Sequence, residues 1–272
     1  MITRLWKEQF RDGCLSIRWI AVLIISIALL VVQQVTSFPD VWQLPDIGPT
    51  FLNYMLLFNY FGSGTHLYLF LLPFLAALTG GSIYANERHN NRLPLLRARI
   101  PRPLIIRSSL ASGFLLGGLG GFLPLALNLL VAVVREPHME FVDGHFTNDG
   151  AAYPLITFDS WVYSFYERNQ VVLLVTILLY VFALSGLLAC LAICLSFWTR
   201  HRYVEIIVPL VLSYIVWMAT SGTSLDGLSF IDFLEIRVAN EACCALGAAV
   251  TLPALIIMIA ACYLLEVRHE AW

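Results

Sequence analysis

Long apolar runs alternate with short polar segments along almost the whole chain. Six of these runs hold about 20 residues each, the length that an α-helix needs to cross about 30 Å of hydrocarbon. We place the predicted spans at residues 19–35, 67–84, 109–134, 171–198, 204–221 and 243–265. The pattern predicts an all-α integral membrane protein with six transmembrane helices, forming a single transmembrane domain over residues 1–272.

The composition agrees with a chain that crosses the membrane several times. Hydrophobic residues make up 59% of the 272 residues and charged residues only 12%, whereas soluble domains carry about 25% charged residues. The six cysteines contain no C-x-x-C pair of the kind found in metal sites. We expect them to pack as small apolar residues, mostly inside the spans.

The charges of the connections predict the orientation of the spans. If both termini are cytoplasmic, the inner segments hold thirteen of the sixteen basic residues, and the outer connections hold twelve of the eighteen acidic residues. Arginine and lysine collect on the cytoplasmic side of membrane proteins. We therefore expect both termini, and the connection over residues 85–108, to lie in the cytoplasm.

Residues 1–18 predict an amphipathic helix on the inner membrane surface. Leu5, Trp6 and Ile17 fall on one helical stripe, and the charged residues lie elsewhere on the helix. A helix of this kind lies in the membrane interface with its basic residues toward water. No cleavage site follows the first apolar run, so we do not interpret this segment as a signal peptide.

The outer connections predict two further features. Residues 51–58 are apolar enough to lie on the outer interface as a short amphipathic helix. Residues 135–170 form the longest polar connection. Residues 222–242 are too short and too charged to span the membrane but too apolar for a solvated loop, so we expect an interfacial or re-entrant helical pair there.

One group of potential metal ligands stands in the long outer connection: His138, Glu140, Asp143, His145 and Asp149. These residue types suit zinc or copper, but their spacing matches no short metal-binding motif. Acidic residues are expected on this side of the membrane for topological reasons alone. We interpret the group as part of a solvated acidic loop and predict no metal site.

Motifs for enzymatic chemistry are missing from the sequence. Lys7 is the only lysine and stands outside any glycine loop, so the chain has no phosphate-binding G-x-x-x-x-G-K-[ST] motif. Residues 61–64 (Phe-Gly-Ser-Gly) lack the first glycine of a serine nucleophile elbow. We predict no catalytic residue and no cofactor in this chain.

The connection over residues 85–108 combines two patterns. It carries six arginines: Arg88, Arg92, Arg97, Arg99, Arg102 and Arg107. It also carries an apolar series: Leu93, Leu95, Leu96, Ile100, Leu104, Ile105 and Ile106. A cytoplasmic location explains why this connection is positively charged, but it does not explain the leucines and isoleucines between the arginines. We interpret the connection as a surface that binds a cytoplasmic partner.

Two features of the spans predict helix packing. Gly113, Gly117 and Gly121 recur every fourth residue and form a flat stripe suited to close contact between helices. Asn128 is the polar side chain most deeply placed in a span, and we expect it to bond across helices rather than to bind substrate.

No acidic residue or arginine lies at mid-depth in a span, which disfavours a secondary transporter.

The order of these elements resembles the permease subunits of bacterial type-2 ATP-binding-cassette exporters. That family ends its second span with small residues and a glutamate, followed by a leucine pair and a Ser/Pro-Arg step. Residues 80–87, Leu95 and Leu96, and Pro101 with Arg102 match this pattern, whereas Asn90 and Asn91 replace the family's Gly-Thr. In the family, this connection forms a coupling helix that sits in a groove of the ATPase subunit.

The resemblance implies the partners and the location of this chain. A separate cytoplasmic ATPase subunit would contact Glu87, Arg88, Leu95, Leu96, Arg97, Arg99 and Arg102. A second permease, either a copy or a paralogue, would complete the export path in the bacterial cytoplasmic membrane. ATP and magnesium would bind the ATPase, and no nucleic acid would be involved. The substrate class stays open, from peptides and lipids to drugs and small ions.

Two other classes of function remain as alternatives. The chain could be a membrane anchor or sensor whose long outer connection binds a ligand, or a secondary transporter. An ATPase that co-purifies with the chain would favour the exporter over both.

Overall fold

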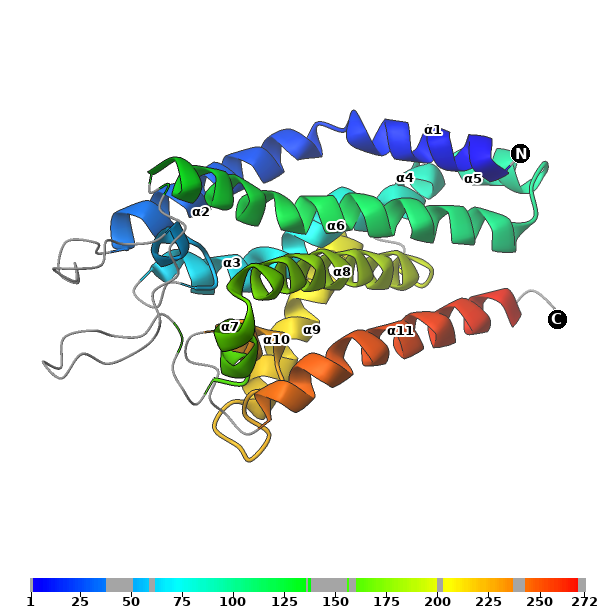
Figure 1. The fold of residues 1–272 in the computed structure, drawn as a ribbon. Coiled ribbons are helices and arrows are strands. Elements are labelled where there is room, and N and C mark those ends of the chain that lie inside the picture. The colour runs from blue at the N-terminus through cyan, green and yellow to red at the C-terminus, as the bar shows by residue number, and fades with distance from the viewer. Residues whose placement is uncertain are drawn as a thin grey trace, which may run out of the picture.

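The computed structural model describes residues 2–37, 51–58, 62–135, 137, 156, 160–199, 203–236 and 243–268. Within this part the chain is helical and contains no strand (Figure 1). Five helices are long and apolar enough to cross a membrane: α2 (Arg18–Thr36), α3 with the π-helix η2 (Ser63–Gly81), α6 (Arg102–Arg135), α8 (Gln170–Ser196) and α11 (Cys244–Arg268). These helices support the prediction of a multi-pass membrane protein.

The sixth predicted span corresponds to α9 (Val204–Thr220), an apolar helix of 17 residues. That length is at the lower end of the roughly 17–25 residues that cross a bilayer. The arrangement with six spans therefore stays a prediction.

Helix α6 is longer than the sequence pattern indicates. It begins at Arg102 rather than near residue 109 and contains 34 residues. At 1.5 Å per residue it is about 50 Å long, which exceeds the roughly 30 Å of hydrocarbon. The end of the predicted 85–108 connection is thus the first two turns of a helix that extends beyond the membrane.

The centre of the bundle is α3 (Ser63–Ala76) with η2 (Ala77–Gly81), which α2, α6, α8 and α9 surround. The Thr79 hydroxyl donates to the carbonyls of Leu75, at 3.1 Å, and Ala76, at 3.2 Å. These bonds satisfy carbonyl groups where the helix widens into its π-helical turn. Such turns are rare and often occur at functional sites.

The glycine stripe of α6 lies where α6 meets η2 and α8. A Cβ atom added to Gly80 would lie 2.7 Å from the backbone nitrogen of Gly117 and 2.9 Å from Cβ of Ala189. A Cβ atom added to Gly121 would lie 2.6 Å from Cβ of Ser185. A Cβ atom added to Gly113 would likewise lie too close to the Ile193 side chain and the Gly80 carbonyl. The three segments therefore approach at a distance that only small residues permit.

The N-terminal helix α1 (Ile2–Cys14) packs along the first half of α6 (Figure 1). The Gln9 amide donates to Glu87, at 2.8 Å, and to Ser109, at 3.1 Å, and accepts from Ser108, at 2.6 Å. Leu5 on the same side is also buried. Part of the stripe that we predicted to face lipid therefore faces protein, while the placement of α1 on the membrane surface stays a prediction.

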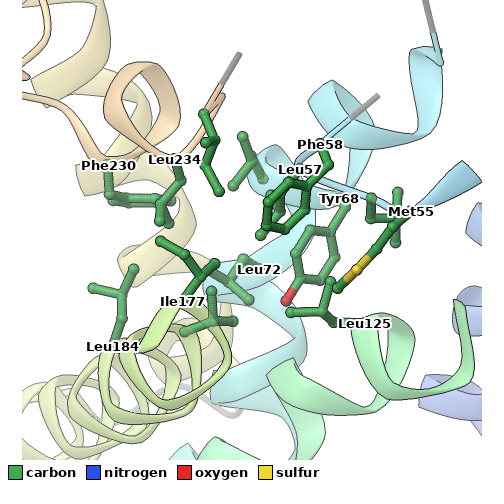
Figure 2. Close-up of a cluster of buried hydrophobic side chains, with 14 of the residues drawn as sticks. Met55, Leu57, Phe58, Tyr68, Leu72, Leu125, Ile177, Leu184, Phe230 and Leu234 are labelled. Carbon is green, nitrogen blue, oxygen red and sulfur yellow. The ribbon is translucent and has the colours of Figure 1, made fainter. Parts of the chain in front are cut away.

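Residues 51–58 differ from their predicted form. They make a 3₁₀ turn, η1 (Phe51–Tyr54), followed by a tight turn, and nearly all their side chains are buried. Figure 2 shows Met55, Leu57 and Phe58 packed beside Tyr68 of α3 and Leu125 of α6. The segment is therefore part of the core rather than a helix on the membrane surface.

Asn128 explains how this non-helical segment can be buried. Its Oδ1 accepts a hydrogen bond from the backbone N–H of Leu56, at 2.7 Å, and its Nδ2 donates to the carbonyl of Tyr54, at 3.5 Å. Backbone groups away from water need such partners. The predicted structural role of Asn128 is confirmed, although its partner is a buried turn and not another helix.

We expect replacement of Asn128 with leucine to lower the free energy of unfolding by about 1–3 kcal/mol, because the buried N–H of Leu56 would lose its acceptor. Thermal unfolding in detergent measures the change. Thr176→Val is a suitable control, since its hydroxyl bonds only within the exposed face of α8. Equal midpoints for the two variants would contradict this role of Asn128.

The segment after α9 also packs onto the bundle. Helix α10 (Phe230–Phe233) is four residues long, and its three apolar side chains are buried. Trp161, just before α7 (Tyr163–Arg168), donates to the carbonyl of Phe233 at 3.0 Å, and Trp217 of α9 donates to Asp232 at 2.9 Å. Residues 222–236 thus form one short buried helix with turns rather than the predicted pair, and residues 237–242 lie outside the described residues.

Candidate functional site

The connection after η2 is a pair of short helices. Helix α4 (Ile83–His89) leads through a turn to α5 (Arg92–Arg97), and a second turn leads into α6. Asn91, just before α5, has a φ of 53°, a left-handed conformation that asparagine tolerates better than most residues. Figure 1 shows α4 and α5 at the same end of the bundle as the start of α1 and the end of α11.

Part of the apolar series faces inward. Four of its members are buried in a cluster with Leu5 of α1 and Phe197 at the end of α8: Leu93, Ile100, Ile105 and Ile106. These four residues hold the connection onto the bundle. They cannot bind a partner, so the interpretation of the whole series as a binding surface was wrong for them.

The rest of α5 and the turn after it face outward, and we call this exposed part the α5 tip: Leu95, Leu96, Arg97 and Arg99. Leu95 has 71% of its surface exposed, and Leu96 is half-buried. Arg97 and Arg99 are exposed beside them. A large apolar side chain therefore stands among guanidinium groups at the polar end of the bundle.

Four of the predicted contact residues bind within the chain, including Arg97, which donates to the Tyr84 hydroxyl at 3.4 Å. Glu87 accepts the hydrogen bond from Gln9 of α1. Arg88 donates to the carbonyls of Ser196 and Thr199 at the end of α8, at 3.2 Å each. These bonds attach α4 to α1 on one side and to α8 on the other.

Arg102 forms an ion pair with Glu266. Both side chains are largely buried, with 15% and 10% of their surface exposed. The pair joins the first turn of α6 to the last turn of α11. Arg107, one and a half turns further along α6, donates to the Tyr263 hydroxyl of α11 at 2.9 Å. No feature of the sequence pattern pointed to Glu266 or Tyr263.

Open clefts lie on both sides of α5. A cleft of about 540 Å³ separates it from α1, and its lining includes Asp12, Arg18, Ser82, Asn86, Glu87 and Arg92. A second cleft, of about 590 Å³, lies toward the ends of α8 and α11, and its lining includes Tyr84, Arg88, Asn91, Arg97, Arg102 and Glu266. Leu95 and Leu96 also line the first cleft, so α5 is a ridge between two clefts.

The first cleft contains a perturbed carboxyl group. Burial raises the pKa of Glu87 above its ordinary value of 4.5, and the hydrogen bond from Gln9 and the nearby Arg92 partly oppose this shift. Asp12, which pairs with Arg92 at 3.5 Å, raises the pKa further. The Glu87 Oε2 and the Ser82 hydroxyl are buried and have no hydrogen-bond partner among the residues that the structure describes.

A carboxyl group whose pKa rises on folding stabilises the folded protein below its unfolded pKa, and that contribution is lost as pH rises through the folded pKa. We therefore expect wild type to lose stability relative to Glu87→Gln between acid and neutral pH. Thermal midpoints of both proteins across this range test the expectation. A difference in thermal midpoint between the two proteins that stays constant with pH, or that changes in the opposite direction, would contradict the expectation.

The described residues contain no group of three or more His, Cys, Asp or Glu side chains that could hold a metal ion. The potential ligands between His138 and Asp149, for which we predicted no metal site, lie outside the described residues. The arrangement around α5 is suited to binding rather than to bond chemistry: an exposed leucine, several arginines and two clefts on a short helix. Comparisons with protein-family models, curated proteins and solved structures find no match for this chain.

Proposed function

We propose that this chain is the membrane-spanning subunit of an ATP-binding-cassette exporter, and that α5 is the coupling helix that binds a separate ATPase subunit. The exposure of Leu95 carries this proposal. Leu95 is 71% exposed close to several arginines, and no side chain in the described part of the protein covers it. A groove with an apolar floor and acidic walls would match both the leucine and the charges.

The contacts around α5 suggest how the partner could act on the membrane domain. Glu87 connects α4 to α1, and Arg88 connects it to α8. The Arg102–Glu266 pair connects the start of α6 to α11. A displacement of α5 would therefore reach several helices through direct bonds. The two clefts beside α5 leave room for such a displacement.

The export path would require a second permease, either a copy or a paralogue. The bundle packs closely around α3 and η2, where the glycines of α6 bring the backbones together. The outer faces of α2 and α9, which flank α3, present large apolar side chains such as Ile24, Val31, Ile215 and Met218. A path between two such bundles needs no opening of this tightly packed centre.

The proposal places the protein in the bacterial cytoplasmic membrane, with six spans, both termini and α5 in the cytoplasm, and α1 at the inner membrane surface. ATP and magnesium would bind the ATPase subunit, and this chain would hold no cofactor and bind no nucleic acid. The excess of basic residues at the α5 end supports this orientation.

We expect a cysteine at Leu225 to react with a membrane-impermeant thiol reagent in intact cells, and one at Leu95 to react only after permeabilisation. Both positions are exposed, and they lie in the turn after α9 and in α5 respectively. The background chain should carry Cys14→Ser and Cys243→Ser, since Cys14 is exposed and Cys243 is partly exposed beside Ser224. Labelling of the Leu95 position in intact cells would overturn the proposed topology.

The proposed function itself is tested by purifying the full chain from its native membrane. An exporter subunit should retain a second polypeptide that hydrolyses ATP, whereas a membrane anchor, a sensor or a secondary transporter should not. Absence of ATP hydrolysis from a well-folded preparation would contradict the proposal.

A further inference from the structure

An apolar groove of about 280 Å³ lies between α6, α8 and α11. Most of its lining residues are apolar: Leu110, Leu187, Cys190, Ile256, Ile259 and Ala260. All three helices are candidate membrane spans, and α11 is the least buried of the five. If these helices cross the membrane, the groove opens toward its hydrocarbon rather than toward water.

A cation stands at one end of this groove. Arg107 lies three residues before Leu110, so the two side chains share one face of α6. The Arg107 Nε donates to the Tyr263 hydroxyl at 2.9 Å, and its guanidinium carbon is 5.6 Å from the centre of the Tyr263 ring. In the described part of the chain, its two terminal nitrogens donate no hydrogen bond to protein. They are exposed at the α5 end of the bundle.

This combination has the chemistry of a lipid site. Tyrosine and arginine are typical of the level of the headgroups, where the apolar part of a side chain contacts lipid and its polar end contacts water. The two terminal nitrogens of a guanidinium group match two oxygens of a phosphate. Basic sites between membrane helices on the cytoplasmic side bind acidic headgroups. The groove continues from this cation along the apolar faces of α8 and α11.

We propose that the groove binds an anionic phospholipid, with its phosphate on Arg107 and one acyl chain along Leu187, Ile256 and Ala260. A soluble anion would use Arg107 but would gain nothing from the apolar lining. The volume is just below the roughly 300–1,000 Å³ of pockets that enclose a whole small molecule. It suits a single acyl chain whose remaining surface stays in the bilayer.

The lipid would join α6 to α11 a short distance from the Arg102–Glu266 pair. Helix α11 contacts α6 little apart from this end, and its principal neighbour is α8. A phospholipid that touches all three helices would fix the position of α11. The acidic lipid content of the membrane would then influence the stability of the bundle.

Native mass spectrometry of the purified full chain tests the proposal, with phosphatidylglycerol and phosphatidylethanolamine offered at equal concentration. We expect wild type to retain one molecule of phosphatidylglycerol in preference to phosphatidylethanolamine. Arg107→Gln should bind it about tenfold more weakly, the effect of losing a hydrogen bond to a charged group. Arg99→Gln, an exposed arginine outside the groove, is the matched control and should bind as wild type does.

A second variant tests the groove separately from the charge. Ala260 is exposed, so Ala260→Trp should fold normally while it fills the groove, and we expect it to lose phosphatidylglycerol. Excess inorganic phosphate should not displace the lipid from wild type.

Three results would overturn the proposal. One is equal phosphatidylglycerol binding by Arg107→Gln and Arg99→Gln, and another is displacement by inorganic phosphate, which would show a site for soluble anions. The third is loss of a two-chain species, with unchanged lipid binding, in Ala260→Trp. That result would assign the groove to a second copy of the chain.

Discussion

Replacement of Glu266 with glutamine is expected to lower the free energy of unfolding by about 3–5 kcal/mol. The change removes the carboxylate that pairs with the largely buried guanidinium of Arg102, and removal of one partner of a buried ion pair is costly. Because the pair joins the first turn of α6 to the last turn of α11, the loss should also loosen the attachment of α11. Chemical unfolding of the purified protein in detergent measures the effect.

Two controls separate burial from simple loss of an ion pair. Asp12→Asn breaks the exposed pair with Arg92, whose side chains are 53% and 65% exposed, and should change stability by no more than about 1 kcal/mol. Replacing Arg102 and Glu266 together with leucine removes both charges and should recover much of the lost stability. If Glu266→Gln were no more harmful than Asp12→Asn, the ion pair would not hold α11.

Apolar run length allowed most of the membrane helices to be predicted from sequence. It placed α9 within one residue of its observed bounds, but it missed the early start of α6. The segment 102–107 carries Arg102 and Arg107, so charge and hydropathy alone predict a loop there. The helix there is stabilised by contacts with α1 and α11, which no local pattern contains.

Residues 51–58 show a second limit of sequence patterns. A series of large apolar residues indicates burial but does not say whether lipid or protein covers it. The deciding partner is Asn128, 72 positions from Leu56 in sequence, which supplies the acceptor for a backbone N–H. Asn128 was recognised as a bonding residue, but its partner could be found only from the fold.

The arginine-rich connection illustrates the same limit for the candidate site. Charge alone favours arginine on the cytoplasmic side whether its side chain faces inward or outward. The fold turns Arg88 and Arg102 toward α8 and α11 and leaves Arg99 exposed. Two acids, Glu266 and Glu270, follow the last apolar run, and no local pattern distinguishes Glu266 as the partner of Arg102.

The exposed Leu95 provides the most direct test of the coupling-helix proposal. Burial of one leucine at an interface is worth about 1.5–3 kcal/mol, and a carboxylate in its place adds the cost of desolvation. We therefore expect Leu95→Asp to weaken ATPase binding about 100-fold or more. Leu96 is a poorer choice, because it packs against the buried cluster that holds the connection to the bundle.

Two matched variants control for effects on folding and orientation. Leu95→Met keeps a side chain of similar volume and should bind the ATPase nearly as wild type does. Leu225→Asp places the same charge on another exposed leucine, in the turn after α9. Acidic residues contribute little to membrane orientation, so all three variants should reach the membrane in similar amounts.

The decisive measurement is the ATP hydrolysis retained on the immobilised chain at equal membrane yield. Wild type, Leu95→Met and Leu225→Asp should retain it, and Leu95→Asp should lose almost all of it. If Leu95→Asp retains as much ATP hydrolysis as wild type, α5 is not the coupling helix and the basic connection serves only to orient the protein in the membrane.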